Sequence, residues 1–227
     1  MATFNIKSIT HTSQMKKALF FIIPYALLIL SCKDKVANNA EVYKNDFESN
    51  NFGDITGAVS ERYNGSLVLG RYNNSGFTLN LNNLPDHDLV TISFDLYIHD
   101  SWDGNSNDPD GPDIWNMAVN GDTYISTTFS NSPCGVNEFC KPQSYPLTYP
   151  NNYNNPKTGA SAVNLPPACK TTPPNGTTLY KITKTFRHSS GVLSLECSDK
   201  LVQSNTPDPK CDESWSIDNL SVKVINL

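Results

Sequence analysis

Three carboxylates near the two ends of the chain could hold a cation together: Asp46, Glu48 and Asp218. Asp218 lies in the last apolar stretch, DESWSIDNLSVKV, and shares the inward parity of Leu220 unless a bulge follows Ile217. A carboxylate on the inner face of a strand is costly without a partner, and a cation supplies one. If the first and last strands pair, these acids can meet and lock the two ends together.

The segment HDSWDGNSNDPDGPDIWN is a second candidate for binding a cation or another ligand. Its five aspartates lie within 14 residues: Asp100, Asp103, Asp108, Asp110 and Asp113. Such a density of carboxylate and amide oxygens suits a hard cation such as calcium. The spacing is not that of an EF-hand loop, because Asp108 occupies the position that needs glycine. The alternative is a loop of Asx turns, in which these side chains cap their own backbone.

Aromatic side chains in this loop and in the long segment 130–178 could contact a sugar. Trp102 lies in the acidic loop, and we expect it to be exposed and able to stack on a sugar ring. Trp115 and Trp215 lie in apolar strands and are expected in the core. The long segment is rich in Pro and Asn and contains three tyrosines: Tyr145, Tyr149 and Tyr153. Either this segment contacts glycans, or it is a covering flap whose tyrosines shield a sheet face.

The sequence lacks the motifs of the common catalytic sites. It contains no G-x-S-x-G elbow, no H-E-x-x-H pair and no phosphate-binding loop. His87, His99 and His188 are expected at turns or strand ends, in contact with solvent. Glycoside hydrolysis needs two carboxylates facing each other across a cleft, and no compact pair with that spacing is visible. An enzyme is therefore the alternative hypothesis and not the leading one.

The elements that must position these residues are short strands. Gly, Pro, Asn and Ser interrupt the chain throughout, and no long segment has helical periodicity. Alternation and composition predict about nine strands: Val42–Glu48, Ser66–Leu69, Phe77–Leu81, Leu89–Ile98, Ile114–Val119, Thr123–Phe129, Leu179–His188, Val192–Glu196 and Trp215–Val224. This pattern predicts an all-β antiparallel sandwich of two sheets, a jelly roll of the concanavalin-like or galactose-binding-like kind. Residues 42–227 form this single domain, with an insertion at 130–178.

The N-terminal segment is typical of a signal peptide. Met15, Lys16 and Lys17 precede the apolar run ALFFIIPYALLIL. This run is too short for a membrane-spanning helix, and a proline interrupts it. The tetrad ending at Cys32 resembles the bacterial lipobox, whose cysteine carries the lipid. We therefore expect residues 1–31 to be a lipoprotein signal peptide, with Met15 a possible true start, and residues 32–41 to be a tether at the bacterial cell envelope.

The charge balance argues against nucleic acid as a partner. The chain carries 17 basic and 22 acidic residues, a net charge of −5, and processing would remove the basic residues Lys7, Lys16 and Lys17. Binding to phosphates requires clustered Lys and Arg. An acidic mature chain suits a surface protein or one that binds cations.

Five cysteines follow Cys32 in an exported chain, where disulfides persist. The first expected pair is Cys197–Cys211, across the loop before the last strand. Cys134–Cys140 would close a small hairpin and leave Cys169 unpaired. Cys140–Cys169 and Cys134–Cys169 are alternatives, because sequence does not fix connectivity. No cysteine spacing indicates a zinc site.

Several motifs resemble an uncharacterised bacterial domain found in exported and surface proteins. They are LPDHDLVTISFDLYIHDSWDGN, GPDIWNMAVNG, TYISTTFSN and DESWSIDNLSV, which together cover roughly 46–224. More loosely, the chain is similar to jelly-roll carbohydrate-binding modules and MAM domains, which open with an Asp-Phe-Glu-like strand and close with an Ile-Asp-Asn strand. In those families the acids of both strands commonly hold a structural calcium. The resemblance thus implies calcium at Asp46, Glu48 and Asp218.

The leading hypothesis is a non-catalytic, lipid-anchored binding or adhesion domain on the cell surface, with a glycan as its ligand and calcium in a structural role. One alternative is a glycoside hydrolase or lyase on the same scaffold. Another is a structural subunit that contacts a surface protein through the long flap.

Overall fold

The computed structural model describes residues 38–107, 111–135, 140–169, 176–204 and 206–227. The lipid-attachment residue Cys32, the signal peptide, most of the tether, and Asp108 and Asp110 therefore lie outside the described residues. Among the described residues, no helix has the length and apolarity needed to cross a membrane.

The described residues form strands and one short 3-10 turn. The elements are β1 (Asn38–Asn45), β2 (Ile55–Thr56), β3 (Ser60–Tyr63), β4 (Ser66–Tyr72), β5 (Gly76–Asn82), β6 (Leu89–Asp100), β7 (Ile114–Val119), β8 (Asp122–Thr128), β9 (Ala162–Leu165), β10 (Thr177–Arg187), β11 (Val192–Asp199), η1 (Pro209–Cys211) and β12 (Glu213–Asn226). All nine expected strands are present, with ends that differ by a few residues. β1 begins at Asn38, so residues 38–41 belong to a strand and not to the tether.

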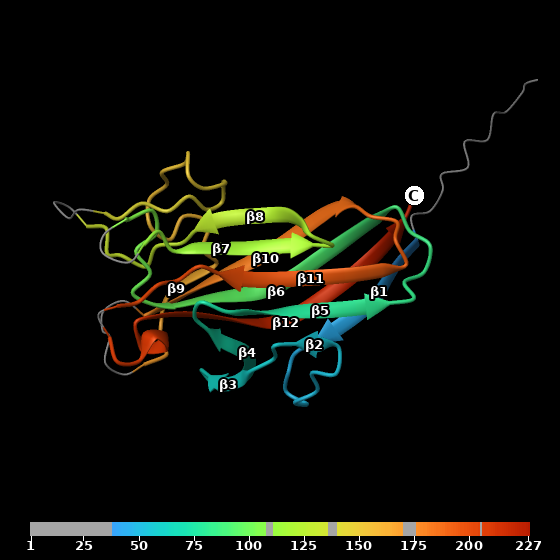
Figure 1. Cartoon of the computed structure of the whole chain (residues 1–227), viewed down its shortest axis with the longest axis horizontal. Helices are drawn as coiled ribbons and strands as arrows, with labels where there is room; N and C mark the ends of the chain where they lie inside the picture. Colours follow the sequence, from blue (N-terminus) through green and yellow to red (C-terminus); the bar gives the residue numbers. More distant parts are fainter. Residues whose placement is uncertain (1–37, 108–110, 136–139, 170–175, 205) are drawn as a thin grey trace, which may run out of the picture. The chain divides into compact units, whose positions relative to one another are not determined.

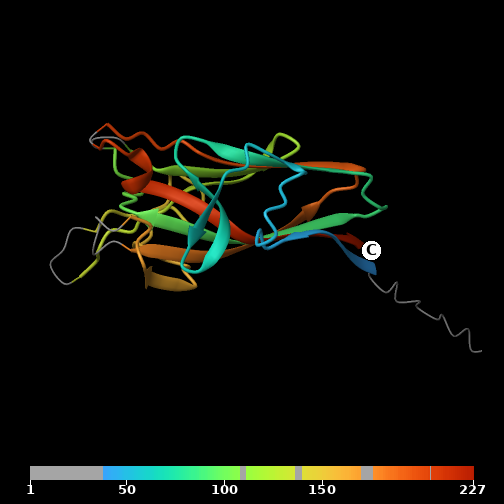
Figure 2. The same ribbon diagram turned by 90° about the horizontal axis from the view of Figure 1, so that it is seen from below.

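The strands build two antiparallel sheets that pack face to face (Figures 1 and 2). Sheet A has the order β3-β4-β12-β6-β10-β9, with β1 also paired to β12, and sheet B has the order β2-β5-β11-β7-β8. Taken along the chain, β4, β6, β10 and β12 belong to sheet A, and β5, β7, β8 and β11 belong to sheet B. This arrangement of eight strands is the jelly roll that the sequence predicts.

Strict alternation places one row of each long strand in the core. Along β6, the residues from Val90 to Ile98 at every second position are buried, whereas the residues between them are partly exposed. The core also contains Trp115 and Trp215, whose rings meet edge to face with centroids 5.8 Å apart. Both tryptophans are fully buried, as expected.

The first and last strands pair, which confirms the arrangement predicted from the chain ends. β1 lies antiparallel to β12, with Asn38 opposite Asn226 and Asn45 opposite Leu220. The register of β12 against β6 shifts between Asp218 and Ser221, where Asn219 has a φ of 55°. This irregularity is a β-bulge, which the slipped alternation of the sequence allowed as one of two explanations.

Three strands were missed: β2, β3 and β9. β2 has only two residues, and β3 and β9 have four each, so none shows enough alternation to be recognised. β9 lies inside segment 130–178 and pairs with the start of β10, which itself begins at Thr177. The insertion therefore contributes a strand to sheet A.

Candidate functional site

The turn after β1 and the middle of β12 bring Glu48 and Asp218 together. Because of the bulge, Asp218 leaves the core face and lies opposite Asp95 of β6. The hydroxyl of Ser66 is 2.8 Å from Oε1 of Glu48 and 2.9 Å from Oδ2 of Asp218. A hydroxyl has one hydrogen, so it can donate to only one of these two oxygens at a time. The backbone N–H of Leu67 donates a further hydrogen bond to Glu48, at 2.6 Å.

The two carboxyls differ in their electrostatic surroundings. Burial raises the pKa of Asp218, and the charges of Asp95 and Glu48 raise it further. The hydrogen bond from Leu67 lowers the pKa of the exposed Glu48. The third predicted ligand, Asp46, is exposed and accepts a hydrogen bond from the backbone N–H of Glu48 at 3.3 Å. Within the described residues, no three His, Cys, Asp or Glu side chains are grouped as metal ligands.

The acidic loop contains a buried carboxyl, Asp113, that the spacing alone did not single out. Its Oδ2 accepts hydrogen bonds from the backbone N–H groups of Asp103 and Gly104, the latter at 2.9 Å. This is the local backbone capping that the sequence left open as the alternative. Asp103 forms an ion pair with Lys141, and Asp100 is fully buried at the end of β6.

Asp113 shares its buried site with Glu213, a residue that sequence reasoning missed. Their exposed fractions are 1% and 4%. Burial raises the pKa of Asp113 to about 7. Burial, followed by the charge of Asp113, raises the pKa of Glu213 strongly. One proton shared between the two carboxyls is the arrangement that this burial favours. The only sequence signal for this buried position is that Glu213, at the start of β12, lies on the same face of the strand as the apolar residues that follow.

Trp102 is not exposed, contrary to the prediction. Its ring is fully buried and meets Phe129 edge to face, with centroids 6.2 Å apart. Its indole N–H donates to the backbone carbonyl of Ser214 at 2.9 Å. The acidic loop folds back onto the end of the sandwich, so a loop position did not imply exposure. Trp102 is therefore unable to stack on a ligand.

The prediction that the histidines contact solvent is also wrong for His87 and His99. His99 is fully buried between the hydroxyls of Thr177 and Ser216, each 2.8 Å from a ring nitrogen, and burial lowers its pKa to about 3. His87 is buried and lies 2.7 Å from a ring nitrogen of the partly exposed His188. The Ser216–His99 pair resembles half of a catalytic triad, but neither side chain is accessible to a substrate.

The disulfides differ in part from the prediction. Cys134–Cys140 forms as expected, but Cys211 is bonded to Cys169 and not to Cys197, and Cys169 is therefore not unpaired. Cys197 lies in the inward row of β11, opposite Phe77, so its thiol points into the core. The strand-end position suggested by the sequence gave no information on which face the thiol occupies.

The insertion runs along the edge of β8. The backbone N–H of Tyr145 donates to Thr128, the hydroxyl of Thr127 donates to the carbonyl of Leu147, and the backbone N–H of Tyr149 donates to Ser126, at 3.2, 2.7 and 3.0 Å. The Tyr145 ring packs on Phe129 and Tyr180, with centroids 4.9 and 5.1 Å away. The insertion is thus a flap that covers one half of this edge.

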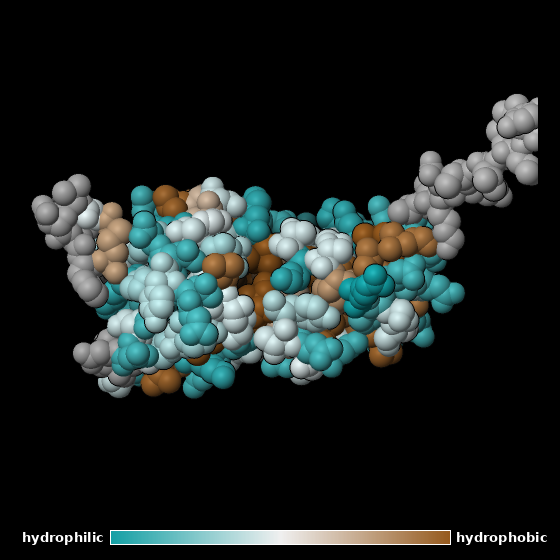
Figure 3. All heavy atoms as spheres, turned by 90° about the horizontal axis from the view of Figure 1, so that it is seen from above, coloured by the Kyte–Doolittle hydropathy of each residue, from teal (hydrophilic) through white to brown (hydrophobic). Residues whose placement is uncertain are grey.

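The other half of this side of the sandwich contains a pocket. It has a volume of about 170 Å³ and lies between β8 of sheet B, β10 of sheet A and the flap. We call it the β8–β10 pocket; it is lined by Tyr124, Ile125, Ser126, Tyr145, Pro146, Leu147, Thr148, Ile182, Thr183 and Lys184. The view from above shows a recess with apolar atoms at its base near the middle of the molecule (Figure 3).

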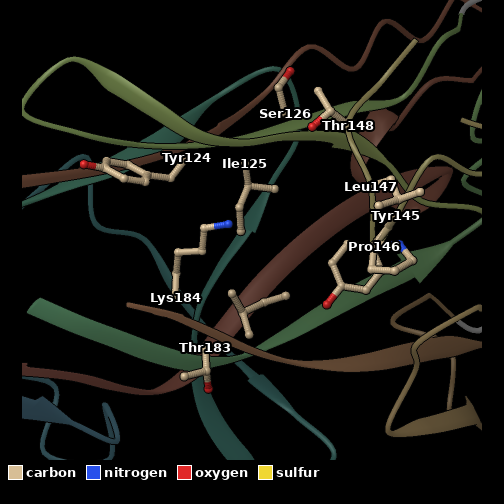
Figure 4. Close-up of a pocket in the computed structure, with 10 residues that line it drawn as sticks. Tyr124, Ile125, Ser126, Tyr145, Pro146, Leu147, Thr148, Thr183 and Lys184 are labelled. Atoms are coloured by element: carbon tan, nitrogen blue, oxygen red, sulfur yellow. The ribbon is translucent and has the colours of Figure 1, made fainter. Parts of the chain in front are cut away.

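The close-up shows how the lining residues contribute to the pocket (Figure 4). Lys184 and Ile125 point toward each other from opposite walls, and Tyr145 extends into the space from the flap. The side chains of Ser126 and Thr183 turn away, so these two residues line the pocket through their backbones. The Tyr124 ring lies 4.1 Å from that of Phe186, between centroids.

Polar groups that could contact a ligand surround an apolar floor. Ile182 is buried at the base, and Tyr145 is half-buried, which raises the pKa of its hydroxyl. The hydroxyls of Tyr145 and Thr148 and the ammonium of Lys184 are the polar side-chain groups of this part of the pocket. The sequence analysis found Tyr145 as a candidate but missed Tyr124 and Lys184. The alternation Tyr180, Ile182, Lys184, Phe186 along β10 could have indicated an inward lysine.

Comparison with known proteins gives similarities of fold only. No protein-family profile matches the chain, and no curated protein sequence does. Among solved structures it is similar to dimeric latent PorU from Porphyromonas gingivalis, with 12% identity, a TM-score of 0.34, and coverage of 66% of this chain and 10% of that one. The chain thus spans about a tenth of the length of PorU.

Two further solved structures are similar to this chain over most of their own length. One is the C-terminal CBM6 of LamC, a marine laminarinase from Zobellia galactanivorans, with 13% identity, a TM-score of 0.32, and coverage of 82% of this chain and 98% of that one. The other is the CBM22-2 xylan-binding domain of Xyn10C from Paenibacillus barcinonensis, with 14% identity, a TM-score of 0.36, and coverage of 80% and 98%. At these TM-scores, none of the three similarities bears on the function of this chain.

Proposed function

We propose that this chain is a non-catalytic glycan-binding domain, held at the bacterial cell envelope by a lipid on Cys32, and that the β8–β10 pocket is its binding site. The observation that carries this proposal is the composition of the pocket. Tyrosine rings and an apolar floor lie beside a few polar groups, in a hollow that opens to solvent. Sites for small ligands combine these features, because apolar area gives affinity and placed polar groups fix orientation.

Sugars match this combination well. A sugar ring has apolar C–H faces that pack on aromatic rings, and hydroxyls that need hydrogen-bond partners. In the pocket, the ring of Tyr145 extends into the space, and Tyr124 lines one end with its ring turned outward and packed on Phe186; the hydroxyl of Thr148 and the backbone of β8 and β10 supply polar groups. The lining residues include no Asp or Glu. Since glycoside hydrolysis uses a pair of carboxyls, this composition favours binding over cleavage.

The experiment that tests the proposal is a glycan array followed by calorimetry. The protein starts at residue 35, because the contacts described above lie within residues 38–227. Tyr124→Ala should weaken binding of the best glycan about ten-fold, since it removes one aromatic wall. Tyr153→Ala is the matched control, because this tyrosine of the insertion is 74% exposed and does not line the pocket. Absence of binding to any glycan, or equal losses in the two variants, would contradict the proposal.

The lipid anchor rests on the lipobox-like sequence that ends at Cys32. Replacement of Cys32 by Ser should move the protein from the membrane fraction to the soluble fraction of the producing bacterium. Labelling with a fatty-acid analogue should be lost in the same variant. Labelling that persists in the Ser variant would exclude Cys32 as the attachment site.

We further propose that Glu48 and Asp218 bind calcium in a structural role. Ser66 has a single hydrogen for the oxygens of Glu48 and Asp218 on either side of it, and carboxylate oxygens are hard ligands suited to this ion. These residues fit two ligands of a site, and a bound ion would neutralise the repulsion between the two carboxylates.

A further inference from the structure

Lys184 occupies an unusual place for a charged residue. Along β10, the residues at even positions point toward the core, and Tyr180 and Ile182 are buried there. Lys184 continues this row and pairs across the sheet with Ile92 of β6, which is fully buried. Its ammonium therefore extends between the two sheets, where β8 ends sheet B and the β8–β10 pocket begins.

This ammonium has no counter-ion among the described residues. No ion pair and no side-chain hydrogen bond joins the Lys184 ammonium to the described part of the chain, and the residues that line the pocket include no acid. Lys181, on the outer face of the same strand, provides a contrast because it forms an ion pair with Asp95 at 2.8 Å. A cation in a partly apolar pocket interacts more strongly with an anion than a cation on the open surface does.

We propose that Lys184 makes the pocket selective for glycans that carry a carboxylate, with a hexuronate unit placed so that its carboxylate meets the ammonium. This inference rests on the proposed glycan-binding function. The volume of about 170 Å³ is below the ~300 Å³ at which drug-sized sites begin, so the pocket accommodates one sugar ring. The tyrosines contact the apolar faces of this sugar ring, and the ammonium of Lys184 pairs with its carboxylate.

The charge of the whole chain limits the kind of acidic glycan. With a net charge of −5, the protein repels a densely charged polyanion at long range. A single cation in the pocket suits one carboxylate per binding site. We therefore expect a preference for glycans with isolated or sparsely spaced uronates over densely sulfated chains.

A competing explanation assigns Lys184 a protective role. An inward-pointing charge near two sheet edges can prevent these edges from pairing with another molecule. On that explanation, removal of the charge causes association of the protein without changing its preference among glycans. The two explanations therefore differ in the quantity that the variant changes.

The test measures dissociation constants for matched pairs of oligosaccharides, one of neutral hexoses and one with a hexuronate at the same position and linkage. The native protein should bind the uronate member of at least one pair ten-fold or more tightly at low salt, and added salt should reduce this ratio. Lys184→Gln should lose the preference, so that the two members of the pair have dissociation constants within about two-fold of each other. Lys181→Gln is the matched control and should keep the preference.

The outcomes separate the inference from the function on which it rests. Binding of neutral members with no preference for any uronate would overturn the inference and leave the glycan-binding function standing. Binding of neither member of any pair would overturn both. An unchanged preference in monomeric Lys184→Gln, with increased association by light scattering, would assign Lys184 the protective role. Retention of the preference in Lys184→Arg would confirm that the charge is the selecting group.

Discussion

The two carboxyl pairs of this protein have the same chemistry and opposite surroundings. Asp113 and Glu213 are almost completely buried beneath the acidic loop, where backbone N–H groups bind Asp113. Glu48 is exposed at the outer face of sheet A, whereas Asp218 beside it is only 4% exposed, and one serine hydroxyl joins the two. The first pair relieves its repulsion by retaining a proton, and the second is accessible to an ion from solvent. The proposed calcium site therefore lies at the pair with an exposed member, Glu48, and not in the loop with the most acids.

The number of aspartates in a segment of the sequence is therefore a poor guide to where a cation could bind. Five aspartates within one loop suggested a cation, yet the buried carboxyl among them caps the backbone of its own loop. The pair proposed to bind calcium comes from the turn after β1 and from β12, far apart in the chain, which the pairing of β1 with β12 brings together.

The largest expected effect is at the buried pair. Asp113→Ala would leave the backbone N–H groups of Asp103 and Gly104 without an acceptor in a buried site. We expect a loss in the free energy of unfolding on the order of 3 kcal/mol, measured by urea denaturation. Asp113→Asn keeps an acceptor oxygen and should lose much less. Equal losses in both variants would show that the charge, and not the acceptor, matters here.

Calcium should stabilise the protein through the surface pair. At a free concentration about a hundred times the dissociation constant, a bound ion adds about 2.7 kcal/mol to the free energy of unfolding. The melting temperature should therefore be higher with calcium than with a chelator, and Asp218→Ala should abolish the difference. Glu213→Gln is the control and should preserve it. A calcium response that is lost in Glu213→Gln and kept in Asp218→Ala would show that the ion binds at the buried pair.

Stability should decrease as the pH rises from 5 to 7, because of the buried pair. Both of its carboxyls have a raised pKa in the folded protein. Their contribution is fully present below the unfolded pKa values near 4; the part from Asp113 is lost as the pH rises toward its folded pKa of about 7, and the part from Glu213 continues to be lost toward its folded pKa of about 11. We expect a decrease on the order of 2 kcal/mol in the free energy of unfolding. Glu213→Gln should flatten this dependence, and an unchanged slope in that variant would contradict the shared proton.

The smallest effect is expected at the hydroxyl between the surface carboxyls. Ser66→Ala removes the donor that Glu48 and Asp218 share, which should lower the free energy of unfolding by about 1 kcal/mol in the presence of a chelator. The control is Ser60→Ala, since that hydroxyl is exposed and makes only a long hydrogen bond of 3.4 Å to Asn50 among the described residues. Denaturation curves that coincide for the two variants would show that the shared hydroxyl does not stabilise the turn.

The fold could be predicted from sequence because its long strands carry their own signal. The alternation of β6 gives both its extent and its inward face, whereas the slipped alternation around Asp218 left open an inward carboxylate or a bulge in β12, and the bulge is present. The pairing of the chain ends followed from the same strands. Short strands such as β3 contain too few residues for alternation to be detected, so they could not be found.

The site was less predictable because it depends on how loops fold back. Trp102 and His99 were assigned to exposed positions from their place along the chain, and both are buried by segments distant in sequence. The bond between Cys169 and Cys211 joins the insertion to the start of β12, a proximity that no local pattern encodes. The inward position of Lys184 was accessible from alternation, but the opening beside it depends on where sheet B ends.

The start of β1 at Asn38 limits how far the domain can stand from a membrane. With an acyl chain on Cys32, six Cα–Cα steps lead to the first paired residue, a reach of at most roughly 20 Å. Asn38 pairs with Asn226, so the proposed anchor would keep the end of β12 near the bilayer, while Glu213 begins the same 14-residue strand at the far end. A tether this short would keep the end of the sandwich that contains Asn38 and Asn226 facing the membrane. The β8–β10 pocket, on the flank of the sandwich, would then open parallel to the membrane, toward the proposed glycan ligands that lie along the envelope.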